Sequence, residues 1–247
     1  MCEIRPLPLK FLLCCLVCVK MAGAQELTGD SVTNSLYNSY AVKLYFNAIG
    51  ENAHIYSGYE YFTPDRNIKG SPYYLSDSPW PSDIMYDDSY YRDIPIMYDV
   101  VKDEVIINRL GQNFKISLVT DKLKSFTFHR HEFIRVSVDS VNGNPLETGF
   151  YDRLYNGKTI VLAKRKTRLQ ETYVYSQINY EYIRQDSYYV IVAGQIVQVD
   201  SKSSVLKLFN SKKSEIKAFI RKNKLNFKSD FEKTLVAISG YYDQLTS

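Results

Sequence analysis

Apolar residues recur every three or four positions near the C-terminal end of the chain, a spacing typical of amphipathic helices. Between positions 231 and 245 one helix face would carry Phe231, Leu235, Ile238, Tyr242 and Leu245. Ser229 and Glu232 have the spacing of a capping box, in which each side chain satisfies a free backbone N–H at the start of the helix. The pattern predicts a helix that needs an apolar surface to cover its stripe.

A second stripe precedes it and consists of Leu206, Phe209, Ile216, Phe219 and Ile220. The dipeptide Asn210-Ser211 predicts a break into a short and a longer helix. Asn223 is expected in the left-handed conformation at the end of the longer helix, with Leu225 as its hydrophobic anchor. Residues 201–245 are therefore predicted to form a helical hairpin, with the Ser-rich segment 201–204 at its N-cap.

The N-terminal part of the chain shows the helical period once more. Leu36, Tyr40, Leu44 and Ala48 share a stripe that begins after Thr33 and ends before Gly50, which predicts a helix over 34–49.

From 53 to 199 the period changes to two. Short aromatic or β-branched runs are separated by Gly, Pro, Asp and Asn, with Asn156-Gly157 as the strongest hairpin signal. About ten strands follow one another with connections too short for crossover helices, which favours antiparallel pairing. The expected fold class is α+β: a large antiparallel curved sheet or half-barrel with the N-terminal helix and the helical hairpin packed on it.

The first 24 residues have a different character. Arg5 and Lys10 precede the apolar run FLLCCLVCV at 11–19, and Ala22-Gly23-Ala24 has the small residues of a cleavage site. This pattern predicts a secretory signal peptide over 1–24, export to the periplasm, outer membrane or exterior, and one α+β domain over 25–247. No later run is long enough for a transmembrane span. All four cysteines lie in the signal segment, so the expected mature chain has no disulfide.

Several strings together resemble a family of uncharacterised secreted or envelope proteins of Bacteroidota. They are IGENAHIYSGYEY, SPYY, IPIMYD, GFYDRLYNGK, SKSSVLKLF and FIRKNKLNFKSD…YYDQL, and they span about 35–245. The resemblance implies a cell-envelope or extracellular location in a Gram-negative cell, and it implies neither an activity nor catalytic residues.

Two clusters could carry chemistry. On a strand, His129 and His131 would share a face and could hold Zn²⁺ if a third ligand arrived from elsewhere. We interpret them instead as part of a charged hairpin end, and we predict no cofactor. The acidic and tyrosine-rich segment 83–99 contains adjacent acids, Asp87 and Asp88, which turn chemistry explains better than the separated carboxyls of a glycosidase.

Tyrosine is the one compositional excess, with 22 residues in the chain. Tyrosines fill half-buried sheet positions, and they are also enriched at binding surfaces. The densest group is predicted to form an aromatic binding surface and consists of Tyr73, Tyr74, Trp80, Tyr86, Tyr90 and Tyr91.

These patterns favour a non-enzymatic binding or accessory protein whose partner is a protein, glycan or lipid of the cell envelope. A periplasmic carrier of lipid or lipoprotein with a hollow half-barrel is the alternative, and a packed interior would argue against it. The net charge of +4 is too small to indicate a nucleic-acid partner. Residues 202–233 hold ten Lys/Arg and three Asp/Glu. This excess is typical of a solvated helical face, with an anionic membrane or nucleic-acid surface as the alternative.

Overall fold

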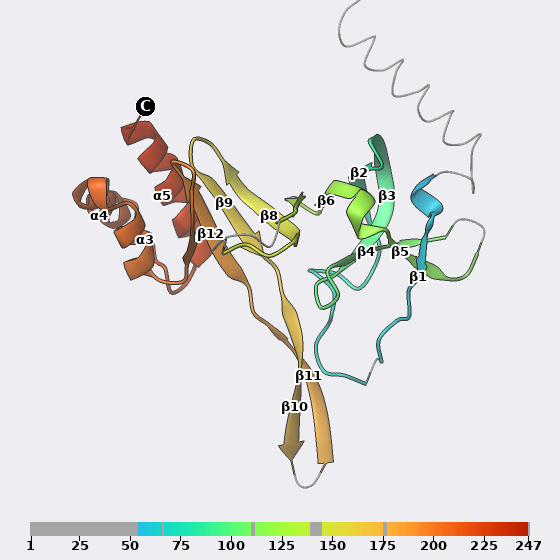
Figure 1. The fold of residues 1–247 in the computed structure, drawn as a ribbon. Coiled ribbons are helices and arrows are strands. Elements are labelled where there is room, and N and C mark those ends of the chain that lie inside the picture. Colours follow the sequence, from blue (N-terminus) through green and yellow to red (C-terminus); the bar gives the residue numbers. More distant parts are fainter. Residues whose placement is uncertain (1–53, 66, 110–111, 139–144, 175–176, 247) are drawn as a thin grey trace, which may run out of the picture. The chain divides into compact units, whose positions relative to one another are not determined.

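The computed structural model of the chain describes residues 54–65, 67–109, 112–138, 145–174 and 177–246 (Figure 1). These residues all belong to one compact unit, Gly50–Ser247. The helix expected at 34–49 and the signal segment lie outside the described residues.

Antiparallel strands dominate the described part of the chain. The strands are β1 (Gly58–Glu60), β2 (Trp80–Tyr86), β3 (Ser89–Asp99), β4 (Glu104–Asn108), β5 (Lys115–Leu118), β6 (Leu123–Phe128), β7 (His131–Val136), β8 (Gly149–Asn156), β9 (Ile160–Lys164), β10 (Thr167–Val174), β11 (Gln177–Arg184), β12 (Ser187–Val192) and β13 (Gln195–Val199). Eleven of them form one sheet in the order β1-β5-β4-β3-β2-β6-β7-β8-β9-β12-β13, and β10 and β11 pair separately as a hairpin. Every pair of neighbouring strands is antiparallel, which confirms the predicted antiparallel sheet, and the large sheet is not closed.

Local turn chemistry explains two of the tight connections. Asp87 and Asp88 have φ values of 49° and 61°, so they form the turn between β2 and β3, as their composition predicted. The Asn156-Gly157 turn is longer than the predicted two-residue loop, because Asn156 pairs with Ile160 and leaves three residues between the strands.

One face of the sheet is lined by aromatic rings in its middle. Directly opposed residues of an antiparallel sheet share a face, and the register aligns Phe126 with Phe133 and Phe133 with Asp152. Tyr98, Phe126, Phe133 and Phe150 are fully buried there, and their ring centroids lie 4.8 to 6.3 Å apart. Aromatic rings from β3, β6, β7 and β8 therefore fill this part of the sheet face.

The C-terminal helices begin and end near the predicted positions. They are α3 (Lys202–Leu208), α4 (Lys213–Lys222) and α5 (Phe231–Leu245), with a short 3₁₀ turn at Asn210–Lys212 between α3 and α4. Two further 3₁₀ turns, His54–Tyr56 and Thr120–Lys122, lie in the β-region. The 3₁₀ turn at Asn210–Lys212 is the predicted break. Ser201 caps α3 in a capping box with Ser204, which confirms the role expected for the Ser-rich segment.

Two cap assignments from the sequence are wrong by one residue. The N-cap of α5 is Asp230, whose carboxylate accepts from the Lys233 amide, and not Ser229. At the end of α4 the left-handed residue is Lys224 (φ 53°), and not Asn223. The Leu225 amide then donates to the Ile220 carbonyl at 3.0 Å, which is the bonding pattern of a Schellman motif.

The helices pack on the end of the sheet that contains β9, β12 and β13. Val161, Val190 and Val199 from these strands form one buried cluster with helix residues that include Ile216, Leu235 and Ile238. Leu235 and Ile238 belong to the stripe predicted at 231–245, so the sheet supplies the apolar platform that the helices need.

Candidate functional site

A buried arginine lies between the aromatic sector of the sheet and the helices. Arg165 follows β9 directly and its side chain is only 2 % exposed. Its guanidinium contacts three carboxylates, Asp152 from β8, Asp186 from the turn before β12 and Glu232 from the first turn of α5. The Arg165 cluster therefore joins three segments that are distant in the sequence.

His131, the first residue of β7, extends the Arg165 cluster. Its Nδ1 lies 2.7 Å from Oδ2 of Asp152, the same oxygen that accepts from Arg165 Nε at 3.0 Å. The Tyr74 hydroxyl lies 3.4 Å from the imidazole, and the Tyr74 ring contacts His131 and Phe133 edge-on. Burial raises the pKa of Tyr74 to about 12, so its hydroxyl stays protonated at neutral pH.

The electrostatics favour the ionised forms of Arg165 and Glu232. Burial opposes the charge of Arg165, but its bonds to Glu232 and Asp152 outweigh burial and raise the pKa of the guanidinium. Burial also disfavours the Glu232 carboxylate, yet the hydrogen bonds and charge of Arg165 lower its pKa below the ordinary value. Arg184 adds a second cation, because its Nε donates to Asp186 at 2.9 Å. Each carboxylate of the cluster thus has a cationic partner.

This arrangement can hold segments together more readily than it can perform catalysis. A carboxylate on imidazole Nδ1 is the geometry that orients a general base. A base must also reach a proton of a substrate, but the hydroxyl against His131 belongs to Tyr74, which is 2 % exposed. Arg165 pairs with carboxylates from β8, from the turn before β12 and from α5, so the cluster connects these elements.

A second buried ion pair lies beside the first. Lys164 Nζ contacts Asp103, whose other oxygen accepts from the Tyr98 hydroxyl, and burial lowers the pKa of Lys164 despite this partner. Gly149 has φ +148°, and a Cβ there would lie 2.2 Å from Asp103 Oδ2 and 2.3 Å from Lys164 Nζ. Glycine at position 149 therefore leaves room for this ion pair and adopts the positive φ without strain.

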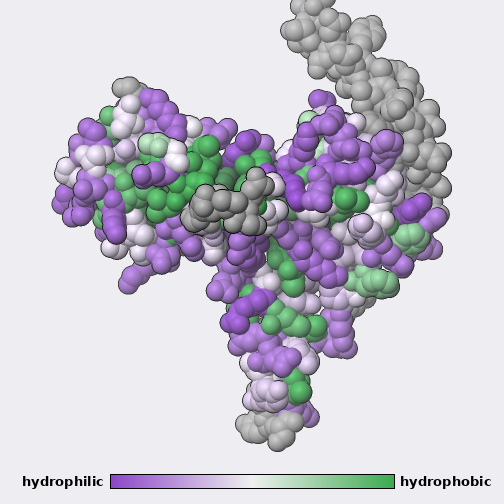
Figure 2. All heavy atoms as spheres, in the orientation of Figure 1, coloured by the Kyte–Doolittle hydropathy of each residue, from purple (hydrophilic) through white to green (hydrophobic). Residues whose placement is uncertain are grey.

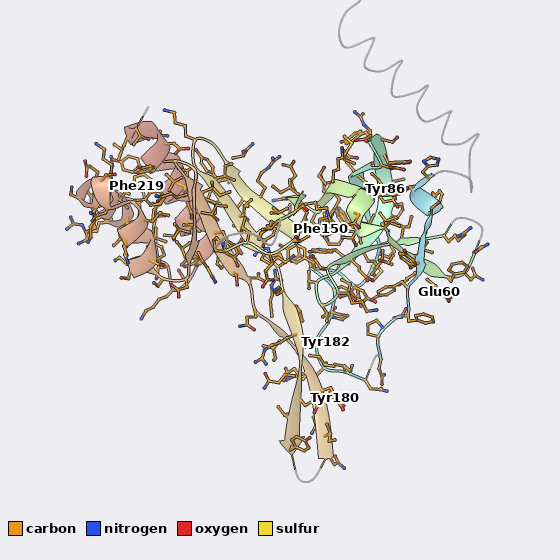
Figure 3. The ribbon with its side chains drawn as sticks, viewed as in Figure 1. Glu60, Tyr86, Phe150, Tyr180, Tyr182 and Phe219 are labelled. Carbon is orange, nitrogen blue, oxygen red and sulfur yellow. The ribbon has the colours of Figure 1, made fainter. Side chains whose placement is uncertain are left out.

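The β10–β11 hairpin carries an exposed apolar face. The register pairs Leu169 with Tyr182, Glu171 with Tyr180 and Tyr173 with Ile178, so these six side chains share one face. Among them Tyr173 is 73 %, Ile178 51 %, Leu169 44 % and Tyr180 39 % exposed. Figure 1 shows the hairpin extending beyond the large sheet, and Figure 3 labels Tyr180 and Tyr182 along β11. We call its apolar members, Leu169, Tyr173, Ile178, Tyr180 and Tyr182, the hairpin face; Glu171 adds one exposed carboxylate among them.

The opposite face of the hairpin is mostly polar. It presents cross-strand pairs Thr172–Asn179 and Gln170–Glu181. Figure 2 shows hydrophobic atoms next to hydrophilic ones along this hairpin, in agreement with the alternation. The two faces therefore differ in chemistry although the same two strands form them.

Contacts at the base of the β10–β11 hairpin attach it to the segment that contains Lys69 and Tyr74. The Tyr182 amide donates to the Lys69 carbonyl at 2.8 Å, and Lys69 Nζ pairs with Glu181 at 2.7 Å. The Arg184 guanidinium lies 4.8 Å from the centre of the Tyr74 ring. The base is thereby tied to the Arg165 cluster, while the hairpin face is left open to solvent.

Only part of the aromatic group predicted from the sequence is accessible. Tyr74, Tyr86 and Tyr91 are at most 4 % exposed and belong to the interior, which is a correction to the expected surface. Tyr73 is half-buried, and its hydroxyl accepts from Tyr61 at 3.3 Å. On β3 the physical reason is strand alternation, which points Tyr90 and Tyr91 to opposite faces.

Trp80 and Tyr90 are exposed at 42 % and 44 %. Trp80 shares its face of β2 with Ile84 and Tyr86, whereas Tyr90 lies opposite Met85 on the other face. The two rings therefore do not form one continuous surface.

The two histidines of the predicted pair have different partners. His129 lies in the turn before β7 with φ 54° and stacks on Trp80 with ring centroids 4.0 Å apart. His131 points to Asp152 instead. Within the described residues, no group of three or more His, Cys, Asp or Glu is arranged to hold a metal ion.

The period of two over 53–199 predicts strands through this part of the chain, but it singles out neither the hairpin face nor Arg165. The alternation of Ile178, Tyr180 and Tyr182 with the polar Asn179 and Glu181 is a visible signal. It is the same signal that a half-buried strand gives. Nothing local marks Arg165, because its partners come from distant segments.

Among the described residues, no helix has both the length and the hydrophobicity that crossing a membrane requires. Comparison of the chain with family models, with curated proteins and with solved structures finds no match in any of the three.

Proposed function

We propose that the protein is a non-enzymatic binding or accessory protein of the cell envelope and that it binds its partner through the hairpin face. The observation that carries the proposal is the exposure of Leu169, Tyr173, Ile178 and Tyr180 on one side of a two-stranded hairpin. A two-stranded hairpin is marginally stable alone in water. Cross-strand apolar pairs stabilise such a hairpin by only about 0.2–1 kcal/mol each, so a binding role explains their exposure better than folding does.

The size of the hairpin face fits a contact surface. The four exposed side chains present roughly 400 Å², taking about 200 Å² for each whole side chain. Patches of this size are often functional in monomeric proteins. A stable interface buries about 800 Å² on each partner, so the partner would also contact surfaces beside the hairpin. Tyrosine suits such a place because its ring is apolar and its hydroxyl remains hydrated.

The test compares two cross-strand pairs of the same hairpin. Tyr173→Ser with Ile178→Ser removes apolar area from the hairpin face, and Thr172→Ser with Asn179→Ser changes the opposite face at the same height. Wild-type and variant proteins would be immobilised, and the envelope components that they retain would be identified and titrated.

We expect the hairpin-face variant to lose affinity for the retained component roughly tenfold or more. The opposite-face variant should bind like wild type. Equal binding by all three proteins would show that the hairpin face does not bind the partner.

Export, location and ancestry are part of the same proposal. The signal segment 1–24, a single domain over 25–247 and the resemblance to secreted Bacteroidota proteins support it. Mass spectrometry of the protein recovered from periplasm, outer membrane and medium would test export, with Gln25 expected as the new N-terminus. A full-length chain confined to the cytoplasm would contradict it.

The carrier alternative requires an apolar hollow on a curved sheet. On the face between β3 and β8 the space is taken by the rings of Tyr98, Phe126, Phe133 and Phe150. Packed rings leave this sector without room for an acyl chain, so binding through an external face has the better support. Saturable uptake of a fluorescent fatty acid that survives changes in the hairpin face would favour the carrier instead.

A further inference from the structure

We propose that the basic surface of α3, α4 and the segment between α4 and α5 docks on an anionic lipid membrane. The surface and the ligand class are separate from the hairpin face, so this inference does not depend on the partner proposed above. It rests on three observations: the charge of the segment, the use of its acids, and the composition of the exposed side of α4.

The charge of the chain is divided unevenly. Residues 202–233 hold ten of the 31 Lys/Arg and three of the 27 Asp/Glu, which leaves 21 and 24 for the rest of the sequence. The helical segment is thus strongly positive, and the remainder is slightly negative. Nine of the ten cations are exposed, and they are Lys202, Lys207, Lys213, Lys217, Arg221, Lys222, Lys224, Lys228 and Lys233.

The three acids of the segment are occupied elsewhere. Glu232 binds Arg165. Glu215 pairs with Lys212, the one cation of the segment that is not fully exposed, at 3.8 Å. The Asp230 carboxylate accepts from the Lys233 amide as the cap of α5. Among the ion pairs of the described residues, none involves any of the nine exposed cations.

The exposed side of α4 is built from cations and small residues. Its exposed positions are Lys213, Ser214, Lys217, Ala218, Arg221 and Lys222. The opposite side buries Ile216 and Ile220, and Phe219 stacks on Tyr241 at 4.1 Å. The helix is therefore fixed with its charged side outward, and Figure 2 shows mainly hydrophilic atoms over α3 and α4.

This composition fits a membrane better than a nucleic acid. Sites for single-stranded nucleic acids add aromatic rings on which bases stack, and sequence-specific duplex sites add amide side chains that read base edges. The exposed positions of α4 hold neither. Clusters of four to eight Lys/Arg on an amphipathic helix are typical of surfaces that bind anionic lipid headgroups.

The test measures binding of the full chain to vesicles. Vesicles of phosphatidylcholine alone would be compared with vesicles that also contain phosphatidylglycerol. The test variant carries Lys213→Gln, Lys217→Gln, Arg221→Gln and Lys222→Gln. The control removes the same charge from exposed cations of the β-region, with Lys102→Gln, Lys124→Gln, Lys166→Gln and Arg168→Gln. Thermal unfolding would confirm that both variants are folded.

We expect wild type and control to bind anionic vesicles, with affinity that falls as salt is added. The α4 variant should bind on the order of 1000-fold more weakly, because each of the four removed cations contributes about a fivefold gain in affinity. Equal binding to neutral vesicles, an equal loss in the control, or tighter binding to a DNA or RNA duplex than to anionic vesicles would overturn the proposal. The variant with Tyr173→Ser and Ile178→Ser should bind vesicles like wild type, and a loss there would assign the membrane contact to the hairpin instead.

Discussion

Arg165 and Glu232 lie 67 residues apart and form a two-pronged ion pair that joins the end of β9 to the first turn of α5. The Tyr188 hydroxyl from β12 donates to the same Glu232 carboxylate at 3.0 Å. Sheet and helical tail are therefore connected by charge as well as by the apolar cluster around Val161 and Leu235.

Removing the charge of Arg165 should destabilise the fold strongly. Arg165→Met leaves Asp152, whose side chain is 1 % exposed, as a buried carboxylate without its main cation. Breaking a buried pair from one side costs about 3–5 kcal/mol. Urea unfolding would measure the loss. Arg168→Met, at an exposed position of the hairpin, is the control and should change the free energy of unfolding by less than about 1 kcal/mol. An equal loss of unfolding free energy in the two variants would show that the Arg165 cluster contributes little to stability.

Acid should weaken the attachment of α5. The pKa of Glu232 is lower in the folded protein than its ordinary value of about 4.3. The carboxylate therefore stabilises the fold above this pH, and that contribution is lost as the pH falls through the lowered folded pKa. We expect the free energy of unfolding to drop between about pH 5 and pH 3. Glu232→Gln should flatten this dependence and lower stability at neutral pH, and a slope unchanged from wild type would contradict the assignment.

The C-terminal end of α5 has its own attachment. The Asp243 carboxylate accepts from the Thr159 amide at 3.0 Å, from the Thr159 hydroxyl at 2.6 Å and from the Tyr155 hydroxyl at 3.0 Å. Hydrogen bonds to a charged group contribute about 1.5–3 kcal/mol. Asp243→Ala should therefore speed hydrogen exchange of the Thr159 amide and of the last turns of α5. Glu171→Ala, which removes an exposed carboxylate from the hairpin, should leave both unchanged.

The left-handed residue after α4 offers a stabilising change. Lys224 has φ 53°, a conformation that costs a residue with a Cβ roughly 1 kcal/mol relative to glycine. Lys224→Gly should raise the midpoint of thermal unfolding. Lys217→Gly, inside α4, should lower it, because glycine in a helix interior costs about 1 kcal/mol. A lower midpoint for Lys224→Gly would show that the lysine side chain has a role beyond the cap.

The sequence by itself determined the parts of the protein that depend on near neighbours. The period of two between 53 and 199 predicted antiparallel strands, and the stripe from Phe231 to Tyr242 predicted α5 with its buried side. Turns such as Asp87-Asp88 follow from local backbone preferences in the same way. Caps were predicted to within one residue, because Ser229 and Asp230 are both good capping residues and Glu232 serves Arg165 instead of a capping box.

Only the tertiary structure decided which side chains meet and which are exposed. Arg165 finds Asp152, Asp186 and Glu232 because β8, β12 and α5 converge on it, and no local pattern records that convergence. The same holds for tyrosines, since Tyr74 and Tyr173 are the same residue type in similar aromatic runs. One is enclosed by Phe128, His131 and Phe133, and the other lies on a hairpin that the large sheet does not cover. Burial depends on the neighbours that the fold supplies, and those neighbours are distant in the chain.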